Sequence, residues 1–310
     1  MKTTEKTPSR RALLALGAGA ALAASLPPAS AHAAATASPR GSGDIARELA
    51  ALEREHAARL GVYAHDTATG RTLHYRAQER FPICSVFKTL AVAAVLRDLD
   101  RNGEFLAKRI RYTAQEASDS GNAPITGRPE NVARGMTVAE LSDAAIRFSD
   151  NAAANLLLRE LGGPAAVTRF ARSTGDPVTR LDRWEPDLNT AEPQRLTDTT
   201  TPYAIGQTYG RLVLGTALES ADRQRLTDWL LGNTTGGERL RAGLPGDWTV
   251  ADKTGAGAYG TNNDVGIAWP PGRPPLVIAV LTTKPRPDAP ADNPLIARTA
   301  ALLATALTGG

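Results

Sequence analysis

Residues 248–283 read WTVADKTGAGAYGTNNDVGIAWPPGRPPLVIAVLTT, and this stretch decides the fold. It holds three runs rich in β-branched and apolar residues, separated by Gly and Pro, which predict strands at Trp248–Lys253, Asp264–Trp269 and Leu276–Thr283. Near the other end of the chain, Val62–Asp66 and Arg71–Tyr75 flank a Thr-Ala-Thr-Gly turn and predict a hairpin. Strands from both chain ends can therefore share one antiparallel sheet.

The segment between these two sets of strands has a mostly helical pattern. Thr137-Val138-Ala139-Glu140 is a capping box that opens a helix ending near Phe148. Asn151–Leu161 predicts the next helix, and Pro164 opens another. Residues 175–202 are rich in Pro, Gly, Thr and Asp and predict a long loop, which inside a compact domain usually serves function.

Two further helices are predicted outside this segment, over 44–60 and over 293–307. The first rests on an apolar stripe formed by Ile45, Leu49, Leu52 and Leu60. Together the elements predict an α/β fold of the α+β type, in which an antiparallel sheet flanked by helices is built from both chain ends and carries an all-helical lobe. One domain would span 44–310, with the α/β lobe at 44–80 and 232–310 and the helical lobe at 81–231.

The start of the chain resembles an export signal. A basic segment with Arg10-Arg11 precedes an apolar run of about 15 residues and the small-residue site Ala31-His32-Ala33. The paired arginines predict the twin-arginine route, so residues 1–33 are interpreted as a signal peptide and 34–43 as a flexible N-terminus. The expected location is secreted, outside the cytoplasm. An N-terminal membrane anchor is the alternative, which the short, Ala- and Gly-rich run disfavours.

Composition excludes several functions. The net charge is +4 for the 310 residues, of which residues 1–33 carry +3 (four basic residues and one acidic), so the remainder is close to neutral. Such a surface gives no electrostatic basis for binding nucleic acid. Cys84 is the only cysteine, which excludes an intrachain disulfide and a cysteine-based zinc site.

The first chemical motif is Ser85-Val86-Phe87-Lys88, at the start of an apolar helical run. Residues three apart share a helix face, so the Lys88 amine can reach the Ser85 hydroxyl and act as its base if burial lowers the pKa of the lysine. Alone, this spacing is more often a solvated helix face. Lysine scarcity adds weight, because residues 34–310 contain only four lysines, and Lys88 and Lys253 both lie in such motifs.

Two more motifs follow. Ser149-Asp150-Asn151 lies between two predicted helices, where it is either a helix cap or a pair of polar groups facing a cleft. Lys253-Thr254-Gly255 is predicted at the end of the 248–253 strand. There it would either bind a substrate carboxylate or be a charged edge that prevents aggregation.

Taken together with Trp184-Glu185-Pro186-Asp187-Leu188-Asn189, these motifs resemble the class A serine β-lactamases, of the exported actinobacterial type. The resemblance runs from about residue 45 to 306. It implies hydrolysis of the β-lactam amide bond through an acyl-serine intermediate, which confers β-lactam resistance, with penicillins and some cephalosporins as substrates. No metal or organic cofactor is implied, and the expected partner is the small-molecule substrate. Nothing in the sequence argues for an oligomer, so a monomer is expected.

The resemblance assigns a role to each motif residue. Ser85 would be the nucleophile, and Lys88 would transfer its proton. Ser149 would relay a proton to the ring nitrogen, and the N–H groups of Ser85 and Ala256 would form the oxyanion hole. The substrate-binding residues would be Asn151, Asn189, Lys253, Thr254 and Gly255.

Glu185 decides between hydrolysis and permanent acylation, because an acyl-serine ester is hydrolysed only if a base activates a water. By the resemblance, Glu185 is that base and Asn189 holds the water with it. Arg183 and Asp198 would pair and close an Ω loop. Glu185-Pro186 would be a cis peptide by resemblance, whereas the sequence alone favours trans.

Two features depart from the common family pattern: the arginine that binds the substrate carboxylate, and a slightly longer stretch between Asn122 and Gly135, which bears on the residue at the cleft mouth. The strand after Lys253-Thr254-Gly255 lacks the arginine that binds the substrate carboxylate, so Arg239 is expected to supply the guanidinium. Asn122 is the candidate for the residue at the cleft mouth. Cys84 is interpreted as a buried packing thiol.

Other functions remain for comparison. A penicillin-sensitive peptidoglycan peptidase shares the serine and lysine motifs but lacks the water-activating loop, and a penicillin-binding sensor stays acylated. Gly255–Gly260 matches G-x-G-x-x-G but precedes a predicted strand, which excludes a dinucleotide site. His56, His65 and His74 are too scattered for a zinc site or a Ser-His-Asp triad.

Overall fold

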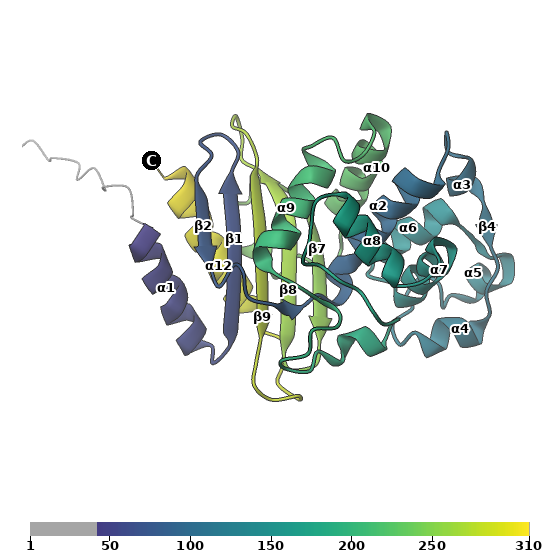
Figure 1. Ribbon diagram of the computed structural model, residues 1–310, viewed down its shortest axis with the longest axis horizontal. Helices are drawn as coiled ribbons and strands as arrows, with labels where there is room; N and C mark the ends of the chain where they lie inside the picture. Colours follow the sequence, from purple (N-terminus) through teal and green to yellow (C-terminus); the bar gives the residue numbers. More distant parts are fainter. Residues whose placement is uncertain (1–41, 310) are drawn as a thin grey trace, which may run out of the picture. The chain divides into compact units, whose positions relative to one another are not determined.

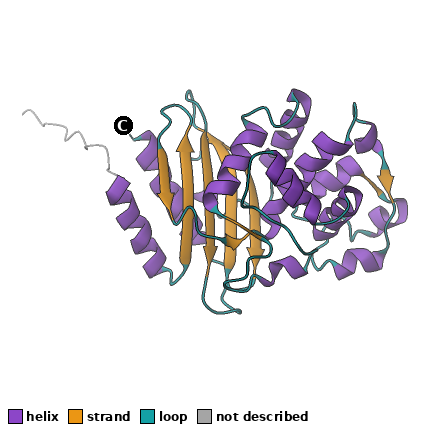
Figure 2. Ribbon diagram, in the orientation of Figure 1, coloured by secondary structure: helices purple, strands orange, loops and turns teal. Residues whose placement is uncertain are grey.

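A five-stranded antiparallel sheet, in the order β2-β1-β9-β8-β7, organises the fold (Figures 1 and 2). The computed structural model describes residues 42–309, so the predicted signal peptide at 1–33 and most of the predicted flexible segment lie outside the described residues. Residues of both chain ends supply the sheet, as predicted: β1 Arg59–Asp66, β2 Thr72–Tyr75, β7 Thr249–Gly257, β8 Thr261–Trp269 and β9 Leu276–Thr283.

Side-chain alternation along the central strands feeds two separate cores. In β9, Val277, Ala279 and Leu281 point into the core shared with the helical lobe, whereas the residues between them join the opposite core. Because successive strand residues face opposite sides, one apolar run serves both layers. The opposite core is closed by α1 Ser42–Glu55, α11 Leu240–Gly243 and α12 Asn293–Thr308.

The other face of the sheet carries the helices of the central chain segment, which continue away from the sheet as the helical lobe (Figure 1). α9 lies across the sheet, and α2 runs through the lobe with every residue buried. The elements are η1 Cys84–Val86, α2 Phe87–Ala94, η2 Val95–Leu99, α3 Glu104–Ala107, α4 Ala114–Asp119, α5 Pro129–Arg134, α6 Val138–Arg147, α7 Asn151–Leu161, α8 Ala165–Ser173, η3 Asp187–Thr190, α9 Pro202–Val213 and α10 Ser220–Leu231. Two small ribbons pair β3 Phe81–Pro82 with β6 Thr199–Thr200, and β4 Arg109–Ile110 with β5 Met136–Thr137.

Several local predictions are confirmed. Thr137 and Glu140 form the reciprocal capping box of α6, and Asp150 caps α7 through the N–H of Ala153. The hairpin of β1 and β2 and the closing helix α12 lie where the sequence places them.

Three boundaries differ from the sequence predictions. The predicted helix over 44–60 begins at Ser42 and ends at Glu55, and Leu60 belongs to β1, although its side chain joins the same core as Leu49. β7 continues to Gly257, so Lys253-Thr254-Gly255 lies inside a strand and not at its end. β8 starts at Thr261, three residues earlier than predicted.

None of the described helices is both long and apolar enough to cross a membrane.

Candidate active site

Ser85 lies in η1, a 3₁₀ helix of one turn that leads directly into α2 and places Lys88 one turn further on. Ser85 is 7% exposed, and the Lys88 side chain is fully buried. Burial lowers the pKa of Lys88, and the nearby carboxylate of Glu185 opposes that shift. A lysine with a lowered pKa can exchange a proton with a neighbouring hydroxyl.

The residues of the Ser149-Asp150-Asn151 motif have two different roles, one structural and one at the site. Asp150 caps the N-terminus of α7, which is the helix-cap alternative that the sequence analysis gives for this motif. Its neighbours both contact Lys88, whose Nζ donates to Asn151 Oδ1 at 2.6 Å and to the Ser149 carbonyl at 2.8 Å. Ser149 has a φ of +55°, a conformation that turns the chain between α6 and α7.

Glu185 completes the centre from the long loop. Its Oε1 lies 3.1 Å from Lys88 Nζ and accepts a hydrogen bond from Ser85 Oγ at 3.3 Å. Asn189 Nδ2 donates to the other carboxylate oxygen, Oε2. Asn189 Oδ1 is buried without a hydrogen-bond partner among the described residues, so it is an acceptor that a water can satisfy.

Asn155 also holds Glu185 in place, a role that the sequence reasoning missed. Its side chain accepts from the Glu185 N–H at 3.0 Å and donates to the Glu185 carbonyl at 2.9 Å. Asn155 lies one helical turn after Asn151 on α7, in an otherwise apolar run. A single amide side chain in an apolar helical run is the sequence feature that could have indicated this role. The Glu185-Pro186 peptide is cis.

The loop is closed at its base by the predicted pair of Arg183 and Asp198. Arg183 Nε donates to Asp198 Oδ2 at 2.6 Å, and Asp198 Oδ1 accepts from the N–H groups of Asp182 and Arg183. Asp198 is 1% exposed. A buried carboxylate with three donors fixes both ends of the loop relative to each other.

Lys253 and Thr254 approach the serines from β7, which is an edge strand. Lys253 Nζ donates to Ser149 Oγ at 3.0 Å and to the Thr254 carbonyl at 2.9 Å. Lys253 is fully buried, which rules out a solvated edge charge. Thr235, a residue that no sequence signal marks, shares a hydrogen bond with the Thr254 hydroxyl.

Gly255 and Gly257 let β7 approach η1 and the long loop. A Cβ at Gly255 would lie 3.1 Å from the Ile83 carbonyl oxygen. A Cβ at Gly257 would lie 2.7 Å from the Asn189 carbonyl oxygen and 2.9 Å from Cys84 Sγ. The glycines therefore bring the strand within reach of Ser85.

Arg239 lies beside this strand. Its Nη1 donates to the carbonyls of Gly255 at 3.2 Å and Asn263 at 2.9 Å, and its Nε donates to Asn293 Oδ1 at 3.1 Å. Burial lowers the pKa of Arg239. It lowers the pKa of Lys253 well below its ordinary value, and Lys88 and Arg239 add to that effect by repulsion. Asp252 and Asp264 oppose part of this shift, and an anion bound beside Lys253 would favour its protonated form further.

The remaining predicted residues lie at the edges of the site. Asn122 is exposed and donates to the Ser149 carbonyl at 3.3 Å, and Ala256 is exposed on β7. Cys84 is fully buried, as predicted, and burial raises the pKa of its thiol. In residues 42–309, no group of three or more His, Cys, Asp or Glu side chains is arranged to hold a metal ion.

The assembled groups are a hydroxyl beside a lysine and a carboxylate, with a second hydroxyl that bridges to another lysine. Such a set can make a serine nucleophilic, protonate a leaving group and activate a water on the resulting ester.

Comparisons with known proteins agree with this arrangement. Residues 44–307 match the Beta-lactamase enzyme family. A β-lactamase of Streptomyces lavendulae is 70% identical over 307 residues, covering 99% of this chain and all of that protein. A carbapenem-hydrolysing β-lactamase, KPC, of Klebsiella oxytoca is 48% identical over 262 residues, covering 83% of this chain and 87% of that protein. The solved β-lactamase of Streptomyces albus G superposes with a TM-score of 0.84 at 66% identity, covering 84% of this chain and 98% of that one.

Proposed function

The chain belongs to the beta-lactamase enzyme family, among its class A serine members, and we propose that it opens the β-lactam ring of penicillins through an acyl-serine intermediate. The observation that carries the proposal is the Glu185 carboxylate, fully buried and 3.3 Å from Ser85 Oγ. A buried base beside the nucleophile supports release of the acyl group by hydrolysis, which a permanently acylated sensor cannot do.

In acylation, Ser85 Oγ attacks the β-lactam carbonyl while Lys88, Glu185 or both accept its proton. The two candidate bases lie 3.1 Å apart, so a proton can move between them. The Ser85 and Ala256 N–H groups would stabilise the oxyanion. Ser149, hydrogen-bonded to Lys253, would deliver a proton to the departing ring nitrogen.

In deacylation, Glu185 removes a proton from a water that attacks the ester. Asn189 would orient that water with its unpaired Oδ1. The substrate carboxylate would bind among Lys253, Thr254 and Arg239, where positive charge is concentrated. Asn151 and Gly255 would contact the rest of the substrate, and Asn122 would border the cleft mouth.

The proposal also covers the substrate preference, the oligomeric state and the location of the protein. Penicillins are the preferred substrates and some cephalosporins are also hydrolysed. The protein acts as a monomer, and residues 1–33 direct its export in folded form by the twin-arginine route, with no stable membrane anchor.

A chromogenic cephalosporin tests the central claim. Purified protein should give steady turnover, with penicillins hydrolysed at higher kcat/KM. A single stoichiometric burst with no further turnover would contradict the proposal and favour a penicillin-sensitive peptidase or a penicillin-binding sensor.

A further inference from the structure

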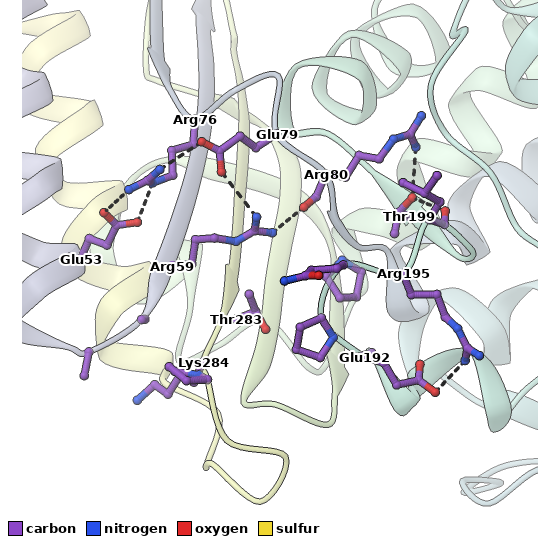
Figure 3. A pocket seen from close by; sticks show the side chains of 18 of the residues that line it. Glu53, Arg59, Arg76, Glu79, Arg80, Glu192, Arg195, Thr199, Thr283 and Lys284 are labelled. Atoms are coloured by element: carbon purple, nitrogen blue, oxygen red, sulfur yellow. Dashed lines mark hydrogen bonds and ion pairs between the residues drawn. The ribbon is translucent and has the colours of Figure 1, made fainter.

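A cavity of about 850 Å³ lies outside the candidate active site (Figure 3). Its walls are the end of α1 with the following turn, the end of β9, and residues 191–196, which leave the Ω loop. None of the residues assigned to the reaction lines it. Its volume is within the range of about 300–1,000 Å³ that is typical of sites for small organic molecules.

The charge of the lining is predominantly positive. Six cationic residues and three glutamates line the cavity, a difference of +3. Glu53 pairs with Arg76, and Glu192 pairs with Arg195. Lys284 is neutralised by Asp292, which lies outside the lining. Among residues 42–309, Arg54 and Arg80 have no carboxylate within 4 Å.

Arg59 is fixed toward the middle of this group. Its guanidinium stacks on Phe81 at 3.9 Å. It donates to the Arg80 carbonyl, and its pair with Glu79 is long, at 3.4 Å (Figure 3). Burial lowers the pKa of Arg59, so the existing carboxylates only partly compensate its charge. A bound anion would complete that compensation.

The rest of the wall is apolar, with Ala57, Ala58, Pro82, Leu196 and Pro285 among its members. Leu196 is 59% exposed, which is unusual for leucine and leaves an apolar surface for a ligand to cover. Cationic and apolar walls together match a molecule that has an acidic group and an apolar body.

We propose that this cavity is a second ligand site, for a small organic anion with an apolar body. The site borders the Ω loop, because Glu192 pairs with Arg183 at 3.5 Å and accepts from Thr190 at 2.8 Å. Thr190 follows Asn189, which holds Glu185. The site needs no β-lactam chemistry and stands independently of the proposed reaction.

Nuclear magnetic resonance tests the site with 1-naphthaleneacetate as the probe. Titration of isotope-labelled protein should shift the backbone amide signals of residues 57–59, 191–192, 194–196 and 283–284 in a saturable manner. The matched cation 1-naphthylmethylamine, with the same ring, should bind at least about tenfold more weakly because of the charge of the site.

Two double variants with reversed charges distinguish binding at the cavity from a general attraction of the probe to the positive charge of the protein. Arg54→Glu with Arg195→Glu alters exposed cavity residues and should weaken the probe at least about fivefold. Arg169→Glu with Arg225→Glu makes the same change in net charge on exposed helix positions outside the lining, and should leave binding unchanged. The proposal would be overturned if the shifts did not saturate or were centred on Ser149 and Thr254. It would also be overturned if the amine bound as tightly as the acid, or if both double variants had the same effect on binding.

Discussion

Replacing Glu185 with Gln should stall the enzyme as an acyl adduct. The amide has the shape of the acid and can still accept a hydrogen bond from Asn189, and the two bonds to Asn155 use the backbone of residue 185. The fold should therefore persist. What disappears is the proton acceptor 3.3 Å from Ser85 Oγ and the carboxylate that Lys88 faces at 3.1 Å.

The expected loss follows from the chemistry of a positioned base. Such a group contributes about 10²–10⁴ in rate, so deacylation should slow by about 10³-fold, or about 4 kcal/mol. Mass spectrometry after mixing with benzylpenicillin should show protein heavier by one intact penicillin. Asp187→Asn is the control, because Asp187 is exposed on the same loop. If Glu185→Gln kept kcat within tenfold of the parent and showed no adduct, the assigned base would be wrong.

Three further changes test other parts of the site. Arg239→Ala should raise KM for penicillins by about 10–100-fold, since it removes the cation proposed to meet the substrate carboxylate, and should cost about 1–3 kcal/mol of stability because its hydrogen bonds to Gly255, Asn263 and Asn293 are lost; an unchanged KM in steady-state kinetics would point to another cation. Asn155→Ala should cost about 1–3 kcal/mol in chemical unfolding and lower kcat, because two backbone bonds of Glu185 are lost; unchanged activity would contradict its positioning role. Burial and Asp252 raise the pKa of Asp264 well above its ordinary value, against the effect of Arg239, so the folded state retains a proton that the unfolded state loses. Stability should then fall as pH rises above about 4, by at most about 1.4 kcal/mol per pH unit for one proton, and Asp264→Asn should flatten this slope between pH 5 and 8 in urea unfolding.

The strands of the sheet were predictable because their apolar runs are long, but their polar ends were not. β8 begins with Thr261-Asn262-Asn263-Asp264, of which the two asparagines and the aspartate disfavour strands, yet all four residues are buried. The tertiary structure compensates for them: Asn263 Nδ2 donates to the Pro82 carbonyl at 2.8 Å, next to the turn that carries Ser85. Such long-range partners cannot be read from local propensity.

The candidate site shows the same division. Ser85 and Lys88 are identifiable because their spacing has chemical meaning, and the other motif residues follow from the resemblance. Asn155 and Thr235 act through neighbours, by holding the backbone of Glu185 and the hydroxyl of Thr254. Positioning residues of this kind depend on where the chain returns to itself, and only the three-dimensional structure supplies that.

The choice of lysine at the centre has a physical basis. Residues 34–310 contain four lysines and many more arginines, yet the two fully buried cations that face Ser149 are lysines. Burial lowers the pKa of both Lys88 and Lys253, and an amine can then give up its proton under conditions in which a guanidinium stays charged. Lys253 has no carboxylate within 4 Å among the described residues, and the more distant Asp252 and Asp264 only partly oppose the lowering of its pKa. A substrate carboxylate would then favour the protonated form of Lys253, which in turn would supply Ser149 with a donor at the moment the ring nitrogen needs a proton. In this arrangement, binding of the substrate itself prepares the proton that its cleavage requires.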